Sequence, residues 1–302
     1  MEGTLSSGAQ IVVVLRRALL GLVLPALLAG CGGQGSSGLA PPRGCELLEA
    51  KPNPEVVSSA ELRAAIEASG LPWRVRHSRS GIELLLVPAG AYVRGAASED
   101  GEAADNEHPA HVVHVDEPYY LGRSEVTQGQ WKQVLGEAPS FFPGADELPV
   151  EQVDRQAVQA FLAAAGLELP TEAQWEVACR AGSTGARYGP LDKVAWTRGT
   201  AGGRTQAVGR LAPNGLGFVD MLGNVAEWTA DAYREDAYGR LPERVVAGRR
   251  ERLGTTLVLR GGSWYDGPRR ARASARSFAA LDYHGSHVGL RVLLLPNAGP
   301  WR

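Results

Sequence analysis

Glycine and proline limit how much regular secondary structure this chain can form. The 302 residues include 38 Gly and 19 Pro, well above the combined share of roughly 12% in average usage. Glycine destabilises helix and strand interiors, and proline interrupts their hydrogen bonds, so this content favours loops and turns over a helical bundle. Helix and strand signals alternate with the loops, and we therefore predict an α+β fold with little regular secondary structure.

The charge balance excludes one class of partner. Lys and Arg number 31 and Asp and Glu number 33, which gives a formal net charge of -2. Affinity for nucleic acid depends on neutralising phosphates, so we expect no nucleic-acid partner. Hydrophobic residues make up 44% of the chain, which is typical of a globular protein rather than a disordered one.

The N-terminus predicts export and lipidation. Arg16 and Arg17 precede the apolar stretch Ala18–Gly30, which is shorter than the roughly 20 residues that span a bilayer and is typical of a secretory signal. Its end resembles a bacterial lipobox, which implies that residues 1–30 are removed and that Cys31 is lipidated. An ordinary cleaved signal with an incidental Cys is the alternative. Gly32 in place of Asp after the Cys implies sorting to the outer membrane.

The remaining chain divides into three parts. A Gly/Ser/Pro-rich tether with one short helix is predicted for residues 31–74, one domain for 75–296 and a tail for 297–302. Cys45 falls in the tether, and Cys179 lies on an apolar helix face that predicts a buried thiol. A disulfide between Cys45 and Cys179 stays open.

Start and stop signals locate the elements of the domain. Each predicted helix begins at a capping residue and ends before a Gly, and each predicted strand is a short apolar or alternating run. The helices begin at Thr127, Asp154 and Thr171, and the strands are two pieces of 81–95 broken by Pro88–Gly90, then His111–Val115, Thr256–Arg260 and Val288–Leu295.

Eight segments in order resemble the formylglycine-generating enzyme family, also called sulfatase-modifying factors. The resemblance implies a C-type-lectin-like α+β fold. It rests on motifs spread over some two hundred residues, which are 87–95 (VPAGAYVRG), 107–113 (EHPAHVV), 124–127 (SEVT), 148–150 (LPV), 168–182 (ELPTEAQWEVACRAG), 213–231 (PNGLGFVDMLGNVAEWTAD), 259–264 (LRGGSW) and 287–292 (HVGLRV).

The chain departs from the family at the copper site. Formylglycine-generating members hold Cu(I) with two Cys after the GGS motif. Here Asp266 occupies the first position, and no Cys follows Cys179. Ala226 also replaces a Trp that lines the family's groove. We therefore expect no copper, and whether the chain is an enzyme is left open.

The resemblance places candidate groove residues near the GGS motif. These are Ser263, Asp266, Arg269, Arg276, His284 and His287. Arg260, Arg269, Arg270, Arg272 and Arg276 together favour an anionic ligand or an unknown protein in the groove. A solvated or salt-bridged surface is the alternative for the arginines, and hydrogen-bonded surface positions are the alternative for the histidines.

The resemblance also implies a calcium site in the loop around the GNVAEW motif. Asp220 and Glu227 would supply carboxylates, and Gly223 and Val225 would supply carbonyls. The alternative is that the two carboxylates hold loop amides without a metal.

These observations predict a lipoprotein of the bacterial cell envelope. It would be attached to a membrane by its lipid anchor, in the outer membrane facing the periplasm or the surface. Its domain would be a non-catalytic binding or scaffold module. The alternatives are an oxidoreductase of the same superfamily with a non-thiolate site and a regulatory partner of an active sulfatase-modifying enzyme.

Overall fold

A computed structural model describes residues 39–240, 245–248 and 254–296. The predicted signal peptide, Cys31 and the predicted tail lie outside the described residues. Within these ranges, no helix is long and apolar enough to cross a membrane. The described residues belong to one unit that begins at Leu39.

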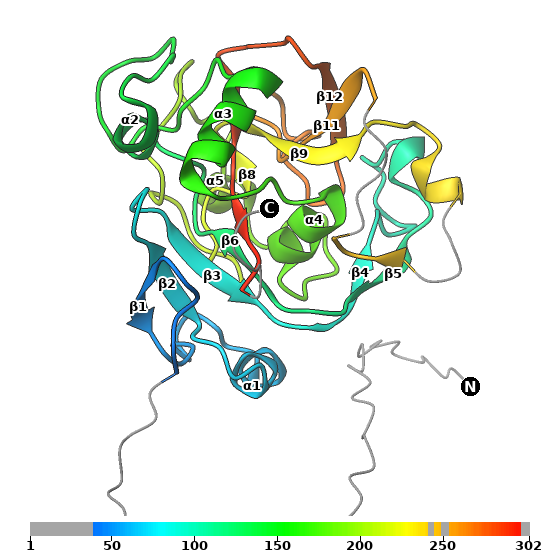
Figure 1. The fold of residues 1–302 in the computed structure, drawn as a ribbon. Coiled ribbons are helices and arrows are strands. Elements are labelled where there is room, and N and C mark those ends of the chain that lie inside the picture. The colour runs from blue at the N-terminus through cyan, green and yellow to red at the C-terminus, as the bar shows by residue number, and fades with distance from the viewer. Residues whose placement is uncertain (1–38, 241–244, 249–253, 297–302) are drawn as a thin grey trace, which may run out of the picture. The chain divides into compact units, whose positions relative to one another are not determined.

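An antiparallel sheet brings early and late parts of the described chain together (Figure 1). Its strands, in spatial order, are β1 (Cys45–Glu49), β2 (Arg74–His77), β3 (Glu83–Val87), β6 (Tyr119–Gly122) and β14 (Leu293–Leu294). This corrects part of the predicted tether, because Cys45 begins β1 and pairs with His77. The short helix predicted there is α1 (Ala60–Ala68), capped by the Ser59 hydroxyl.

A second sheet forms one wall of the site described below. Its strands, in spatial order, are β12 (Arg276–Ala280), β11 (Thr256–Arg260), β9 (Ala226–Ala232) and β13 (Val288–Leu290). The strand predicted over 288–295 is thus divided, since β13 joins this sheet and β14 joins the first. The other described strands are β4 (Gly90–Arg94), β5 (His111–Val115), β10 (Val245–Val246), β7 (Ala195–Trp196) and β8 (Leu222–Gly223).

The longer helices begin where their capping residues predict. Thr127 caps α2 (Gln128–Leu135), Asp154 caps α3 (Arg155–Ala165) and Thr171 caps α4 (Glu172–Arg180), each through a side-chain oxygen that accepts a backbone N–H. The shorter helices are α5 (Leu191–Val194), η1 (Asp105–Glu107) and η2 (Ala237–Arg240).

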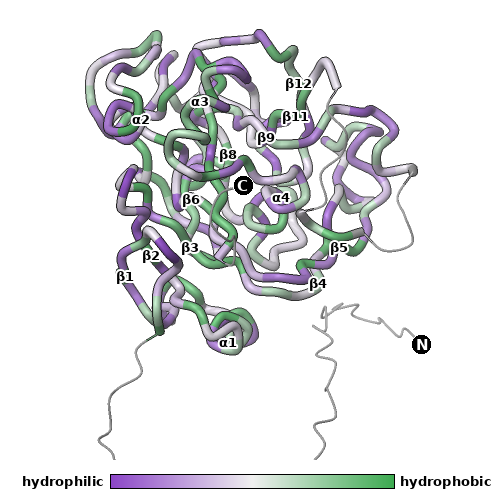
Figure 2. Tube along the Cα trace, in the orientation of Figure 1, coloured by the Kyte–Doolittle hydropathy of each residue, from purple (hydrophilic) through white to green (hydrophobic). Residues whose placement is uncertain are grey.

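Helix α4 lies at the centre of the fold (Figure 1). All nine of its residues are buried, and it packs against β4, β9 and β11. Around it the buried apolar side chains of the described chain form a continuous core, and the tube coloured by hydropathy shows hydrophobic stretches along β3 and β6 (Figure 2). The mixture of short helices and strands with long loops confirms the predicted α+β class.

Candidate functional site

Two glycines fold the segment after β11 back on itself. Gly261 and Gly262 both have positive φ, at 92° and 70°, a conformation that side chains rarely adopt. A Cβ at Gly262 would lie 2.8 Å from the backbone of Arg270. Only glycine fits there, so the GGS motif packs against Arg270, in the loop that leads to β12.

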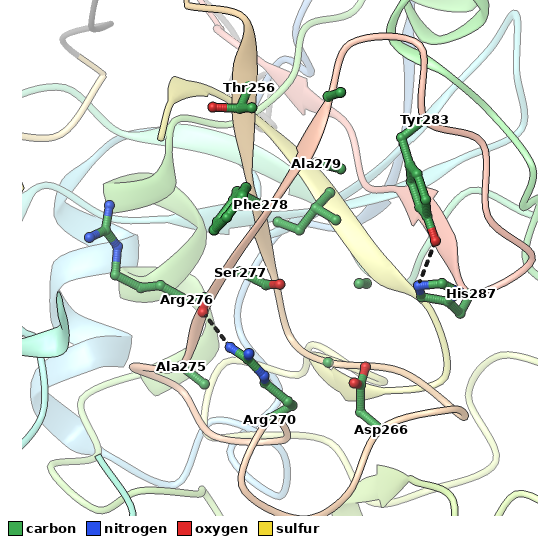
Figure 3. A pocket seen from close by; sticks show the side chains of 14 residues that line it. Thr256, Asp266, Arg270, Ala275, Arg276, Ser277, Phe278, Ala279, Tyr283 and His287 are labelled. Atoms are coloured by element: carbon green, nitrogen blue, oxygen red, sulfur yellow. Dashed lines mark hydrogen bonds between the residues drawn. The ribbon is translucent and has the colours of Figure 1, made fainter. Parts of the chain in front are cut away.

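A groove of about 440 Å³ lies beside this loop. Small apolar side chains line much of it, among them Ala226 from β9 and Ala275 and Ala279 from the β12 region. Its polar side chains include Asp266, Arg270, Tyr283 and His287, together with Thr256, Arg276 and Ser277 (Figure 3). A concave, mostly apolar site with a few placed polar groups is typical of small-molecule binding.

Asp266 is oriented by its own loop. The buried Ser263 hydroxyl donates to the Asp266 carboxylate at 2.6 Å, and the Asp266 amide donates to the Ser263 carbonyl at 3.0 Å. The Tyr283 hydroxyl and His287 Nε2 lie 3.3 Å apart on the same side of the groove (Figure 3). Burial lowers the pKa of His287, and the nearby Asp266 carboxylate opposes this shift.

The arginines predicted as ligands divide into two groups. Arg276 lines the groove, but its guanidinium pairs with Glu172 at 2.6 Å and its side chain is 1% exposed, so it is occupied inside the protein. Arg269 is exposed, donates to the Glu102 carbonyl and does not line the groove. Arg270 was in the wider set of arginines but not among the candidate site residues, and it does line the groove.

The two predicted histidines also separate. His287 lines the groove, whereas His284 is exposed and its Nδ1 contacts the Asp282 carbonyl at 2.9 Å. The sequence places both near the same motif, and only the turn between them decides which one faces the groove.

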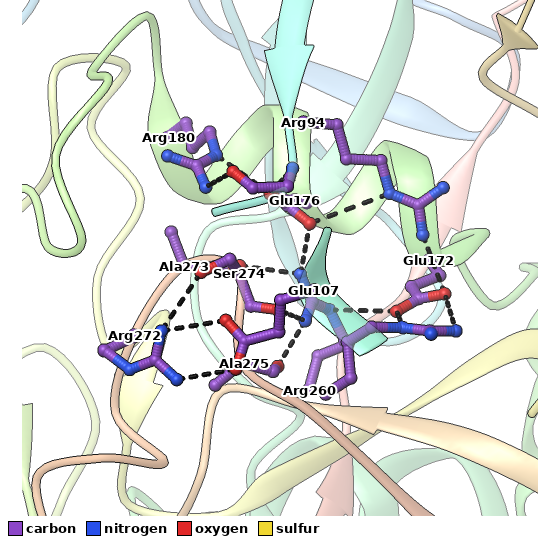
Figure 4. Close-up of polar contacts among 12 residues, drawn as sticks. Arg94, Glu107, Glu172, Glu176, Arg180, Arg260, Arg272, Ala273, Ser274 and Ala275 are labelled. Carbon is purple, nitrogen blue, oxygen red and sulfur yellow. Dashed lines mark hydrogen bonds and ion pairs between the residues drawn. The ribbon is translucent and has the colours of Figure 1, made fainter. Parts of the chain in front are cut away.

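A buried ionic network supports the groove wall from behind (Figure 4). Glu176 of α4 accepts from Arg260 of β11 at 2.5 Å and from Arg180 at 2.9 Å. Burial would raise the pKa of Glu172, but surrounding guanidinium groups, Arg94 foremost, lower it to about 2. Helix α4 thus holds β4, β11 and β12 in fixed positions.

The groove does not supply the ligands that Cu(I) prefers. Cys45 lies in β1 and Cys179 is buried in α4, both thiols are free, and neither lines the groove. Burial raises the pKa of Cys179 to about 12, so it stays a thiol at neutral pH. A carboxylate, a phenol and an imidazole do not replace a soft thiolate pair.

The predicted calcium ligands are committed to protein contacts. The Glu227 carboxylate accepts from Arg291 Nη2 at 2.8 Å and from Trp175 Nε1 at 2.6 Å. One oxygen of Asp220 accepts from the Gly209 amide at 2.5 Å, while the other is buried without a hydrogen-bond partner. Among the described residues, no group of three or more His, Cys, Asp or Glu is arranged to hold a metal. A calcium ion at Glu227 would have to displace Arg291, so the predicted set does not fit calcium in this arrangement.

Sequence reasoning missed two buried ionisable residues that lie beside Asp220 and Glu227. Both lie in quoted motifs. Glu125 follows β6, and Arg291 lies in the turn between β13 and β14. Burial, together with the charges of Asp220 and Glu227, raises the pKa of Glu125 well above its ordinary value. The available signal was the position of Glu125 and Arg291 within the motifs 124–127 and 287–292, where each is a buried ionisable residue.

Comparison with known families decides the identity of the domain. The profile of the Sulfatase-modifying factor enzyme 1-like domain matches residues 73–295. This chain belongs to the sulfatase-modifying factor family. The match confirms the family resemblance, and its limits lie close to those predicted for the domain.

Relatives of this sulfatase-modifying-factor-like protein have different names. It is 27% identical to the formylglycine-generating enzyme of Streptomyces coelicolor, over 76% of this chain and 93% of that protein. It is 30% identical to hercynine oxygenase of Mycolicibacterium smegmatis, over 64% of this chain and 57% of that protein. Among solved structures, PvdO from Pseudomonas aeruginosa superposes with a TM-score of 0.66 and 25% identity, covering 73% of this chain and 97% of PvdO. The relatives thus agree on the domain and include more than one enzyme.

Proposed function

We propose that this protein is an envelope lipoprotein whose sulfatase-modifying-factor-like domain binds a ligand or a protein segment in the groove without catalysis. The observation that supports this most is Asp266. It stands where the resemblance places the first copper-binding Cys, and its carboxylate accepts a hydrogen bond from Ser263. No thiol lines the groove, so the residues that would hold Cu(I) are replaced by groups suited to recognition.

The shape of the groove also supports a binding role. Ala226 stands where the resemblance places a Trp, and it leaves part of the roughly 440 Å³ open. A volume between about 300 and 1,000 Å³ is usual for small-molecule sites. Arg270 lines the groove and forms no ion pair with a described residue, which is compatible with an anionic group on the ligand.

The membrane attachment is part of the proposal. Lipidation of Cys31 would place the domain in the bacterial cell envelope, in the outer membrane facing the periplasm or the surface. Export requires no contribution from the groove, so the anchor and the binding site can be tested separately.

Absence of formylglycine formation is the first prediction. We expect the purified full chain, supplied with copper, oxygen and a sulfatase-type peptide containing Cys, to form no aldehyde above a metal-free control in mass spectra. Asp266→Cys should not restore activity either, because a second thiolate is still absent. A relative that retains both Cys serves as the positive control.

An oxidoreductase with a non-thiolate site is the second candidate function. The observation that favours it is the placement of His287, Tyr283 and Asp266 around one groove. The test is the metal content of the purified protein. Stoichiometric iron or copper that His287→Ala loses, together with any oxidase activity, would support this candidate and contradict the binding module.

A further inference from the structure

Two opposite charges in the groove form no ion pair with the residues that the structure describes. Asp266 and Arg270 both line it, and neither forms a salt bridge with any residue that the structure describes. Asp266 holds only the Ser263 hydroxyl through its side chain. The Arg270 guanidinium donates through Nη1 to the Arg276 carbonyl at 2.7 Å. Its other N–H groups have no hydrogen-bond acceptor among the described residues.

The buried arginines nearby differ from Arg270, because each of them forms an ion pair. Arg260 pairs with Glu176, Arg272 with Glu107 and Arg276 with Glu172, at distances from 2.5 to 2.6 Å. The fold therefore neutralises the buried arginines of this region internally, whereas the exposed Arg269, which does not line the groove, contacts a backbone carbonyl. Arg270 lines the groove and pairs with no carboxylate of the described residues, so its charge is available to an anionic group of a ligand.

The two charges lie at the same end of the groove (Figure 3). Beyond them the lining is mixed: Phe278 and Ala279 supply apolar surface, while Thr256 and Ser277 add hydroxyl groups. A bound molecule would thus meet a carboxylate and a guanidinium at one end and both apolar and hydroxyl side chains along the rest. Opposite charges that are not paired to each other can each take a charged group of the ligand.

From this arrangement we propose that the groove binds a zwitterion, a free α-amino acid with an apolar side chain. Its ammonium group would contact Asp266, its carboxylate would contact Arg270, and its side chain would lie along the alanines. The proposal deepens the proposed binding function and rests on it. Because burial lowers the pKa of His287, the ring is mainly neutral at pH 7 and does not compete with the ammonium for Asp266.

The backbone and the loop contacts keep the two charges in place. The Ser263 hydroxyl fixes one Asp266 oxygen at 2.6 Å, and the Asp266 carbonyl accepts the Arg198 amide at 2.9 Å. The Arg270 backbone packs against Gly262, where a Cβ would not fit. Preorganised charges lose less freedom on binding, which favours affinity.

The test uses the full chain in detergent and titration calorimetry with the twenty standard amino acids. Apolar amino acids should bind, with phenylalanine as the reference ligand. Phenylalanine amide lacks the carboxylate and N-acetylphenylalanine lacks the ammonium group, and both should bind more weakly. If no amino acid binds at up to about 10 mM, the zwitterion proposal is wrong.

Two substitutions assign each charge to its group. Asp266→Asn still accepts the Ser263 hydroxyl but has no charge, and it should weaken phenylalanine and its amide about 10- to 100-fold while leaving N-acetylphenylalanine unchanged. Arg270→Gln should weaken phenylalanine and N-acetylphenylalanine about 3- to 10-fold, less because the site is exposed. Arg269→Gln, outside the groove, is the matched control and should change nothing.

The outcomes separate this inference from the proposed function. If the amide binds as tightly as phenylalanine and Arg270→Gln has no effect, the groove binds a cation and the zwitterion proposal is wrong, while a binding role stands. Ala280→Trp, at an exposed position of the groove lining, should abolish binding; unchanged binding would place the amino acid elsewhere. Aldehyde formation or a stoichiometric redox metal would instead contradict the proposed function.

Discussion

Asp220 is a buried residue whose backbone conformation and unpaired carboxylate oxygen are both unfavourable to folding. Its φ is +52°, and one of its carboxylate oxygens is buried without a hydrogen-bond partner. Burial raises its pKa to about 6, although the Gly209 amide and Arg291 act in the opposite direction. Glu125, buried beside it, has a raised pKa for the same main reason. The folded protein therefore holds protons here that the unfolded chain releases.

This predicts that stability falls as the pH rises. For a carboxyl group whose pKa is higher in the folded state, stability is fully present below the unfolded value near 3.8 and is lost as the pH rises through the folded value near 6. We expect Asp220→Asn to remove part of this loss, about 3 kcal/mol at pH 7 at most. Urea unfolding from pH 4 to 7.5 measures it, with the exposed Asp192→Asn as control. An unchanged pH profile in Asp220→Asn would show that Asp220 is not the group.

Glu227, the second predicted calcium ligand, determines what we expect of calcium binding. Because Glu227 is bound to Arg291 and Trp175, we expect calcium to leave the melting temperature of chelator-treated protein unchanged. A rise on adding calcium that Asp220→Asn abolishes would instead establish the site implied by the family resemblance and would require Arg291 to move.

At the scale of elements, α4 combines two roles that its sequence pattern separates. The Thr171–Gln174 capping box defines its start, and its apolar residues predict one buried face. Glu172, Glu176 and Arg180 would ordinarily lie on an exposed face, but strands on several sides bury them. The strands provide arginines as partners for the two glutamates, and Arg180 pairs with Glu176 of its own helix. The helix is thus an ionic junction between β4, β11 and β12.

Removing one charge at this junction should destabilise the whole domain. Glu176→Gln removes the carboxylate that lies 2.5 Å from the fully buried Arg260 and leaves only Glu172, at 3.7 Å, as its ionic partner among the described residues. Breaking a buried pair from one side costs about 3–5 kcal/mol. Chemical denaturation at pH 7 should show this loss, whereas the exposed Glu99→Gln should stay within about 0.5 kcal/mol of the parent. A loss below about 1 kcal/mol would mean that Glu172 and the carbonyls of 273–275 are sufficient partners for Arg260.

At the scale of the whole molecule, the first sheet joins distant parts of the chain. β1 and β2 extend the sheet that β14 closes on its other side, so the segment before residue 74 belongs to the folded domain rather than to a spacer. The tether that we propose between the lipid anchor and the domain is therefore shorter than the sequence predicts, because Cys45 already lies in a strand.

The anchor itself is a prediction at this scale. Mass spectrometry of the native protein should find Cys31 acylated and at the N-terminus, because Arg16 and Arg17, the apolar stretch and the lipobox occur in order. Cys31→Ser should release the protein from membranes while its melting temperature is unchanged. An N-terminus at another residue, or membrane association in Cys31→Ser, would contradict lipidation.

The sequence by itself determined the features that depend on neighbours along the chain. Capping residues located α2, α3 and α4, short apolar or alternating runs located β5 and β11, and ordered motifs identified the family. These signals are local, because a cap or a turn is satisfied by residues a few positions away.

Only the tertiary structure decided which charged groups are available to a ligand. Arg270 and Arg276 are six positions apart in one arginine-rich segment, and nothing local distinguishes them. Arg276 meets Glu172 from α4, 104 residues earlier in the chain, whereas Arg270 meets no carboxylate among the described residues. The same holds for Glu227, whose partner Arg291 comes from a turn 64 residues later. A charge is neutralised by whatever the fold brings within a few ångströms, and contacts across such separations leave no periodicity or spacing in the sequence.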